Sequence, residues 1–423
     1  MKKEKYGSII ENKKRWLYIP LGLIIFMCMG TIYSWSIFRT PIENSFNIGA
    51  TESGLPYMFF LVFYALAMPF AGSYMDKYGP RIMTITGGLL ISIGWFLSGF
   101  TTSITFLTIS YGVIGGTGVG IAYGAPMAVA AKWFPDKEGL AVGLTLGGFG
   151  LSPFITAPAA NWLITNFGAF TTFKILGGLF AIIITLLALP LKFPEANHQI
   201  SQNKNTNNQN LEIDPKNMFK SRSFYALWTT FVIGTIIGLM AIAISGPVAE
   251  ELINLDSATA SIYVSFFAIF NGIGRPIFGA LTDKLKAKKT AIISFSLIIL
   301  ASLLMIINNS ANPALYFIAF AIFWLNLGGW LAIAPAATSY FFGKKNYIKN
   351  YGYLFTAYGV GAVIGNLLSG SIRDIMGSYY FVFYPTIILA ALGIIIALLF
   401  LKKDQISDQS KNYKKVKYSN EKI

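Results

Sequence analysis

The decapeptide GSYMDKYGPR at residues 72–81 returns in altered form as GALTDKLKAK at residues 279–288. At this constant offset of 207 residues, the first copy aligns with the second at Gly72 and Gly279, Asp76 and Asp283, Lys77 and Lys284, and Arg81 and Lys288. The same offset aligns Pro69 with Pro276, and the aromatic pair at 133–134 with the pair at 340–341. Matches at one fixed offset in both halves predict a chain built from a duplicated unit.

Both copies stand between long apolar runs, and the composition of the whole chain has the same character. Hydrophobic residues make up 54% of the 423 residues and charged residues only 12%, whereas a water-soluble domain carries about 25% charged residues. In a soluble protein the net charge of +15 would suggest nucleic acid as a partner. Here it indicates a distribution of Lys and Arg between the two sides of a membrane. We therefore expect the lipid bilayer as a partner, and no nucleic acid.

Twelve apolar runs reach the length of about 20 residues that a helix needs to cross a bilayer. They lie at 16–38, 54–71, 82–100, 106–130, 140–164, 171–191, 224–248, 258–280, 290–307, 314–336, 351–371 and 380–401. Because they are apolar all round and twice as long as a barrel strand, they predict helices. The sequence therefore predicts an all-α integral membrane protein with twelve transmembrane helices in two pseudo-symmetric six-helix bundles.

The predicted bundles cover residues 1–191 and 223–401. Residues 192–222 form a linker between them, and its polar stretch ANHQISQNKNTNNQN at 196–210 is typical of a flexible segment. Residues 402–423 form a polar tail.

Lys and Arg are sorted between the two sides of the predicted membrane protein. Of the 33, 29 fall in the termini, the linker and every second loop, and three, Arg39, Lys174 and Arg373, fall in the opposite loops. Cytoplasmic segments carry the excess of these residues. We therefore expect a multi-pass protein of the cell membrane with both termini and the linker in the cytoplasm.

The repeated pattern G-x-x-x-D-[RK]-x-G-x-[RK], after the second and the eighth span, resembles the major facilitator superfamily. This resemblance implies alternating access between the two halves. An Asp at a helix end with nearby cations can latch neighbouring helices in one state and release them in another. We therefore expect gating roles for Asp76, Lys77, Arg81, Asp283 and Lys284. The alternative is that these charges only fix the topology.

Arg275 is the remaining cation, and it lies within a span. The first half has Met68 at the equivalent position. Arg275 lies eight residues before Asp283, which at the rise of an α-helix places it about 12 Å inside the membrane from the cytoplasmic loop. Inserting an arginine at that depth costs at least about 2.5 to 3.5 kcal/mol. None of the 18 carboxylates is expected in the membrane interior, so an anionic substrate is its predicted partner, and a guanidinium matches a carboxylate bidentately. The alternative is an arginine bonded to backbone carbonyls or to Asn271, one turn away.

Four further segments resemble the oxalate/formate antiporter family, which is related to the monocarboxylate transporters. They are YSWS at 33–36, GVGIAYG at 118–124, NGIGRP at 271–276 and NYG at 350–352. In oxalate-exchanging members, the arginine of the eighth helix acts with a lysine of the eleventh, and aromatic side chains wall the cavity. This sequence has Tyr358 where that lysine is expected. The substrate-binding residues that we expect are Arg275, Asn271, Tyr33, Tyr123, Tyr358, Trp324 and Trp330, although membrane aromatics also face lipid.

The loss of one cation bears on the expected substrate. One cation in a low-dielectric cavity suits a monoanion, because excess charge there is costly. We therefore expect a secondary transporter of a small carboxylate anion, most simply a monocarboxylate such as formate, acetate, lactate or pyruvate. Coupling by anion exchange and by proton symport both remain open. An oxalate/formate-type dicarboxylate exchanger and a non-transporting membrane solute sensor are the alternatives.

Other kinds of chemistry have little support in the sequence. The only cysteine, Cys28, and the only histidine, His198, have no neighbours that would complete a metal site. We therefore expect no metal, no cofactor and no enzymatic activity, and we expect a monomer. The glycines at 115, 116, 118 and 120 fit close helix packing, with Gly147, Gly148 and Gly150 as the expected partners.

Overall fold

The computed structural model describes residues 15–134, 138–194, 213–308, 310–343 and 346–402. The low-complexity stretch at 196–210 and the tail after residue 402 lie outside these residues. The elements are α2 (Tyr18–Gly30), η1 (Thr31–Ser34), α3 (Trp35–Phe46), α4 (Ala50–Ser98), α5 (Ile104–Leu107), η2 (Thr108–Gly115), α6 (Gly116–Trp133), α7 (Glu138–Phe167), α8 (Ala169–Ala188), α9 (Pro215–Met218), α10 (Arg222–Ile253), α11 (Ser257–Ile306), α12 (Pro313–Phe342), α13 (Tyr347–Met376), η4 (Tyr379–Val382) and α14 (Phe383–Phe400).

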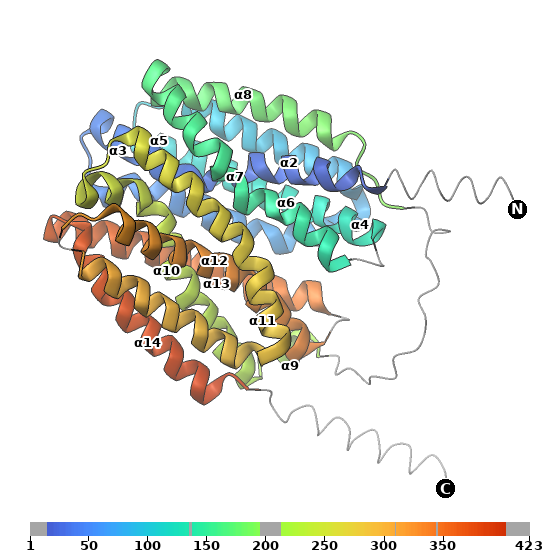
Figure 1. Cartoon of the computed structure of the whole chain (residues 1–423). Helices are drawn as coiled ribbons and strands as arrows, with labels where there is room; N and C mark the ends of the chain where they lie inside the picture. The colour runs from blue at the N-terminus through green and yellow to red at the C-terminus, as the bar shows by residue number, and fades with distance from the viewer. Residues whose placement is uncertain (1–14, 135–137, 195–212, 309, 344–345, 403–423) are drawn as a thin grey trace, which may run out of the picture.

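The helices form two bundles that lie side by side (Figure 1). Elements α2 to α8 make the N-terminal bundle, and α10 to α14 make the C-terminal bundle. In the described residues, eleven helical segments are long and apolar enough to cross a membrane, and the 50-residue helix α11 counts as one of them. Because α11 is broken in its middle, it crosses twice, so the chain crosses twelve times, as predicted. We call the end where α2 begins and α14 ends the terminal end, and the opposite end the distal end.

The two long helices break at repeat-equivalent residues. Helix α4 breaks at Gly79 (φ 75°, ψ 168°), and α11 breaks at Lys286 (φ 67°, ψ 160°), 207 residues later. Glycine adopts this backbone region freely, whereas a residue with a side chain is strained there. The repeat predicted from the sequence therefore extends to the backbone conformation of the turn, although only one copy has a glycine in it.

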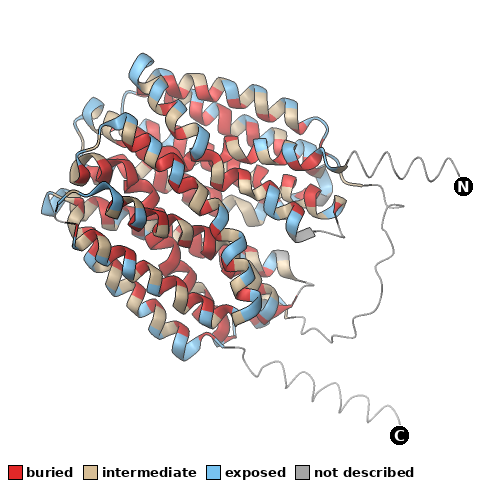
Figure 2. Ribbon diagram, in the orientation of Figure 1, coloured by how far each residue is buried: buried red, intermediate tan, exposed pale blue. Residues whose placement is uncertain are grey.

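Burial follows the position of each helix in the bundles (Figure 2). In α10, 89% of the most apolar stretch is buried in the protein, whereas the figure is 33% for α8 and for the crossing that contains α14. Large apolar side chains on the outside stay exposed, among them Phe70 (70%) and Ile375 (83%). Apolar exposure on this scale is unusual for a water-soluble protein, and it gives the bundles a surface that faces lipid.

Glycines bring helices of the N-terminal bundle into backbone contact, but with other partners than expected. A Cβ on Gly116 would lie 2.2 Å from the Phe60 carbonyl of α4, and one on Gly148 would lie 2.1 Å from the Leu23 carbonyl of α2. The expected packing of the 116–120 glycines against Gly147, Gly148 and Gly150 was therefore wrong. A glycine pattern indicates close packing without naming the partner helix.

Arg39 lies inside the protein and not in a loop. The first crossing continues through α3 to Phe46, and Arg39 is only 1% exposed. Its guanidinium donates to Ser53 Oγ at 3.1 Å, to the Ala50 carbonyl, and to the Ala243 carbonyl of the C-terminal bundle at 3.4 Å, and Glu43 lies 3.7 Å away. The loop expectation for Arg39 was wrong, because hydropathy ends a span at the first charge although the helix runs on. It was also wrong for Lys174 and Arg373, which lie in α8 and α13.

Candidate substrate site

Arg275 lies in the first half of α11, where this helix faces α7 of the other bundle. Its Nη1 donates to the Leu146 carbonyl of α7 at 2.9 Å. Its Nε and Nη2 are buried and have no hydrogen-bond partner among the described residues. The alternative of backbone bonding therefore holds for one nitrogen of three. Leaving buried, charged donors without acceptors is costly.

Asn271 precedes Arg275 by one turn and also faces α7. It is fully buried, and its Nδ2 donates to the Trp324 carbonyl of α12 at 3.2 Å. Its Oδ1 lies so close to α7 that a Cβ on Gly150 would sit 2.7 Å from it. Asn271 therefore spaces the two bundles and fixes α11 to α12 beside the arginine.

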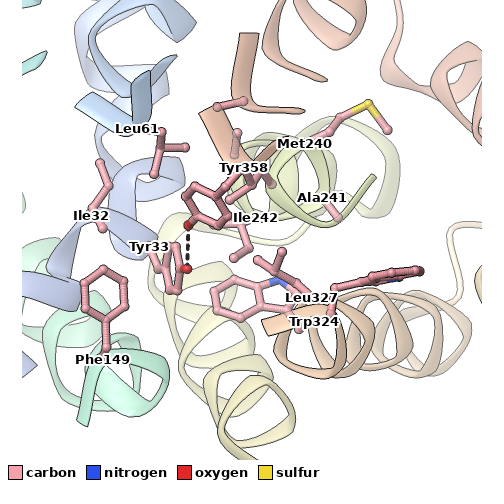
Figure 3. Close-up of a cluster of buried hydrophobic side chains, with 14 of the residues drawn as sticks. Ile32, Tyr33, Leu61, Phe149, Met240, Ala241, Ile242, Trp324, Leu327 and Tyr358 are labelled. Atoms are coloured by element: carbon pink, nitrogen blue, oxygen red, sulfur yellow. Dashed lines mark hydrogen bonds between the residues drawn. The ribbon is translucent and has the colours of Figure 1, made fainter. Parts of the chain in front are cut away.

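Tyr33 and Tyr358 join the bundles near this point (Figure 3). Tyr33 of η1 and Tyr358 of α13 are each 1% exposed, and their hydroxyl oxygens lie 2.7 Å apart. One of the two hydroxyls is the donor in this bond and the other is the acceptor. The accepting hydroxyl can still donate its own hydrogen to another group. Arg275 lies near enough to act electrostatically on Tyr33 and on Tyr351. Tyr33 therefore lies within electrostatic range of the guanidinium, and its pair with Tyr358 carries a neutral hydrogen-bond donor.

Trp324 connects the tyrosine pair to Asn271. It is fully buried, and its ring lies 6.4 Å from that of Tyr33. Its Nε1 donates to Ser245 Oγ at 3.0 Å, and its backbone carbonyl receives the bond from Asn271. Trp324, which was predicted to line the substrate cavity, is thus held by hydrogen bonds at its indole nitrogen and at its backbone carbonyl.

Tyr123 belongs to an aromatic wall on the N-terminal bundle. Its ring lies 5.6 Å from Phe149, which in turn lies 5.1 Å from Tyr33. Tyr64 completes this wall at 5.2 Å from Tyr123 and 5.8 Å from Tyr358. Sequence reasoning missed Tyr64, although a signal was present, because the 207-residue offset aligns it with Asn271.

Trp330 is not brought to this cluster. It is fully buried within the C-terminal bundle, 5.2 Å from Phe295 and 6.2 Å from Phe231 by ring centroids. A Cβ on Gly234 would lie 2.3 Å from its Nε1, a nitrogen without a partner among the described residues. The structure therefore places Trp330 in the packing of α10 against α12 and α11.

The predicted gating residues lie at the terminal end. Lys77 is exposed, with Nζ 5.1 Å from the ring centroid of Tyr78, and Arg81 and Lys284 are exposed. Asp283 is also exposed and makes no ion pair with any described residue. The Asp76 side chain lies outside the described residues. The gating role of these five residues stays a prediction.

Two surface hollows lie away from the arginine, at the distal end. One, of about 380 Å³, lies between the bundles and is lined by Thr40, Asn161 and Glu250 among others. The other, of about 370 Å³, is lined by Asn254, Asn308 and Tyr380 among others. Across the described residues, no three His, Cys, Asp or Glu side chains gather in a way that suits a metal ion.

Comparisons with known proteins agree with the fold. The Major Facilitator Superfamily matches residues 21–340 and 231–417. The oxalate:formate antiporter of Oxalobacter formigenes is 30% identical over 365 residues, which cover 86% of each chain. Human monocarboxylate transporter 12 is 22% identical over 401 residues, which cover 86% of this chain and 76% of the relative.

A solved structure shares the same architecture. A bacterial homologue of the human lysosomal transporter Spinster, in an inward-facing and occupied conformation, superposes with a TM-score of 0.71 at 16% identity, over 93% of this chain and 98% of the other. At this identity the likeness concerns the fold. The chain is therefore a multi-pass membrane transporter that belongs to the major facilitator superfamily, as a homologue of the oxalate:formate antiporter and the monocarboxylate transporters.

Proposed function

We propose that the protein carries a small monocarboxylate such as formate, acetate, lactate or pyruvate across the cell membrane by alternating access, with Arg275 binding the carboxylate. The observation that carries this proposal is the pair of buried guanidinium nitrogens, Nε and Nη2, without an acceptor among the described residues. A bound carboxylate gives both nitrogens acceptors and balances their charge. The related antiporter and monocarboxylate transporters carry names that refer to such anions.

Charge balance favours a monoanion. Arg39 also lies within a crossing, but it has Glu43 at 3.7 Å. Arg275 has no described carboxylate within ion-pair distance, so it contributes one uncompensated charge. Tyr358 adds a neutral hydroxyl and no second cation. A dianion would bring one charge more than the site balances, which is costly in a low-dielectric interior.

The wall residues have distinct roles in this proposal. Tyr33 and Tyr358 supply the free hydroxyl hydrogen, Trp324 and Tyr123 shape the apolar side of the site, and Asn271 holds α11 in register with α7. The site lies where the two bundles meet, which is where rocking of the bundles changes access. Asp76, Lys77, Arg81, Asp283 and Lys284 act in gating at the terminal end.

Orientation follows from the distribution of Lys and Arg. We place the terminal end in the cytoplasm, since 29 of the 33 basic residues lie on that side. The bundles are taken to end at residues 191 and 401, with the linker at 192–222. We propose that a monomer is the functional unit, with one anion site between its bundles. An arginine without its anion is unfavourable in a closed site, which favours anion exchange, while proton symport with the acid satisfies the same charge balance.

Uptake by the purified protein in liposomes tests the proposal. We expect uptake of labelled formate, acetate, lactate or pyruvate into vesicles that contain an unlabelled monocarboxylate, and weaker uptake of oxalate. Preferred uptake of oxalate would defeat the charge argument. Binding of a carboxylate without uptake of any of them would identify a sensor. If a pH gradient accelerates uptake into vesicles that contain no unlabelled monocarboxylate, the mechanism is proton symport and not obligate exchange.

A further inference from the structure

Helix α4 begins at the distal end without a cap of its own. Its N-cap residue is Gly49, which has no side chain to accept from the first free N–H groups of the helix. The equivalent helix of the second half, α11, begins with Asp256 at the position 207 residues later, and Asp256 accepts from the backbone N–H of Thr259 at 2.9 Å. Its hydrogen bonds with Thr259 lower the pKa of Asp256 below its usual value. The two halves therefore differ in how the same helix start is capped.

The missing cap of α4 comes from the other bundle. Asp374 of α13 accepts from the backbone N–H of Ala50 at 2.8 Å through Oδ1 and from that of Thr51 at 2.9 Å through Oδ2. Both N–H groups belong to the first turn of α4, where a carboxylate is favourable. The carboxylate of Asp374 thus does for α4 what Asp256 does for α11, but across the interface between the bundles.

The surrounding backbone is shaped for this contact. A Cβ on Gly49 would lie 2.8 Å from Asp374 Oδ1, and a Cβ on Gly370 would lie 2.6 Å from the Thr51 Cα. Asn366, Gly370 and Asp374 follow each other at intervals of four residues, so they share one face of α13. Asn366 continues the seam inward, because a Cβ on Gly54 would lie 3.2 Å from its Oδ1.

We infer that Asp374 is a latch that holds the distal entrance closed. When the bundles rock to open this end, α13 leaves the start of α4, so α4 loses its cap while α11 keeps its own. Two other bonds between the bundles lie at the same end, from Thr40 to Glu250 at 2.8 Å and from Arg39 to the Ala243 carbonyl at 3.4 Å. Asp374 differs from them because its bonds cap the start of α4, so opening of the entrance removes the cap of this helix. The inference uses alternating access and does not depend on which substrate is carried.

Accessibility of a single cysteine tests the latch. Cys28→Ala removes the one native cysteine, and Ser36→Cys introduces a reporter in α3 that is 2% exposed. Ser36 faces α10, because a Cβ on Gly246 would lie 2.9 Å from the Ser36 carbonyl. In this background we expect Asp374→Ala to raise the rate of labelling by a polar maleimide about fivefold. This is the change in equilibrium constant that corresponds to the loss of an ordinary N-cap. Asp374→Asn, which keeps the size of the side chain and loses its charge, is expected to act in the same direction.

Two controls separate a latch from a merely structural cap. Asp256→Ala removes a cap within one bundle, so it is expected to lower the melting temperature without raising the labelling rate. Adding Gly49→Asp to Asp374→Ala gives α4 a cap of its own, which is expected to restore the melting temperature while labelling stays high. The latch is refuted if folded Asp374→Ala and Asp374→Asn proteins are labelled at the parent rate, or if Asp256→Ala raises labelling as much. The assay reads no transport, so its failure leaves the monocarboxylate proposal standing.

Discussion

Arg39 and Arg275, which both lie within membrane crossings, differ in how far the donors of their guanidinium groups are satisfied. Arg39 has acceptors in Ser53 Oγ and in two backbone carbonyls, with Glu43 nearby. Arg275 has one backbone carbonyl and two buried nitrogens without a described partner. Satisfied donors stabilise a fold, whereas unsatisfied donors carry a cost that a ligand can remove. This difference is the reason for proposing Arg275, and not Arg39, as the anion site.

Removing the Tyr358 hydroxyl tests the role of the tyrosine pair. Tyr358→Phe breaks the 2.7 Å bond with Tyr33 and removes one of the two hydroxyls of the pair. We expect the affinity for the preferred monocarboxylate to fall about fivefold, the weight of one hydrogen bond of about 1 kcal/mol. Tyr57→Phe is the matched control, because its hydroxyl bonds only to the Leu239 carbonyl at 3.4 Å. Equal loss of affinity in the two variants, measured by substrate competition in liposomes, would contradict this role.

From the sequence, candidates for the site stood out where a residue broke the repeat or the family pattern. Arg275 was found because Met68 stands at its equivalent position, and Tyr358 because it replaces an expected lysine. Tyr64 was missing from the candidates and Trp330 was included among them. Aromatic residues are common in any membrane helix, and the rotation of the helix decides which way such a side chain points. Contacts between the bundles, such as those of Tyr64, arise only from tertiary packing.

At the scale of elements, the break in α11 carries local backbone strain at Lys286. Lys286 occupies a backbone region that glycine adopts at no cost, and its repeat partner Gly79 shows the unstrained version. The polar Lys286 Nζ bonds to the Asp283 carbonyl at 3.3 Å, which offsets part of that cost.

Lys286→Gly is therefore expected to stabilise the protein. Relief of strain at a positive φ is worth about 1 kcal/mol or more, so the melting temperature in detergent should rise. Lys289→Gly, three residues later in regular helix, should lower it, because glycine costs about 1 kcal/mol there. A lower melting temperature for Lys286→Gly, at a level similar to Lys289→Gly, would show that residue 286 is not strained.

Neighbouring glycines of α7 give a second test at this scale. Gly148 touches the Leu23 carbonyl of α2, whereas a Cβ on Gly147 would meet nothing within 4 Å. Gly148→Ala is expected to lower the melting temperature, since α2 and α7 must separate by more than an ångström, and Gly147→Ala to leave it unchanged or raise it slightly. Thermal unfolding of the two variants decides this, and tolerance of Gly148→Ala would contradict the packing.

The number and type of the elements followed from the sequence, but their ends did not. Hydropathy reports the part of a helix that lies in hydrocarbon, so the first span ended at residue 38 although α3 continues through Arg39 to Phe46. The extra turns carry Arg39 and Glu43, which are polar enough to resemble a loop. These turns reach the interface between the bundles, so the loop assignment also hid the contacts that close the distal end.

For the whole molecule, the balance of charge during transport would follow from the proposed anion site at Arg275, which has no described carboxylate within ion-pair distance. Exchange of one monoanion for another moves no net charge, and symport of a monoanion with one proton moves none either. We expect a potassium diffusion potential of either sign across the liposome membrane to leave uptake of the preferred monocarboxylate unchanged. Uptake that follows the potential would mean that the site binds an anion without balancing its charge across the cycle.

The central claim is that the guanidinium of Arg275 binds the carboxylate, and Arg275→Gln tests it most directly. The variant keeps a polar side chain with an N–H donor, but it is shorter than arginine and carries no charge. Binding of the preferred monocarboxylate, measured as the ligand-induced shift in melting temperature together with uptake in liposomes, is expected to weaken at least tenfold, the loss of one charge-assisted hydrogen bond or more. A folded Arg275→Gln protein that binds and carries the monocarboxylate as well as the parent would contradict the account.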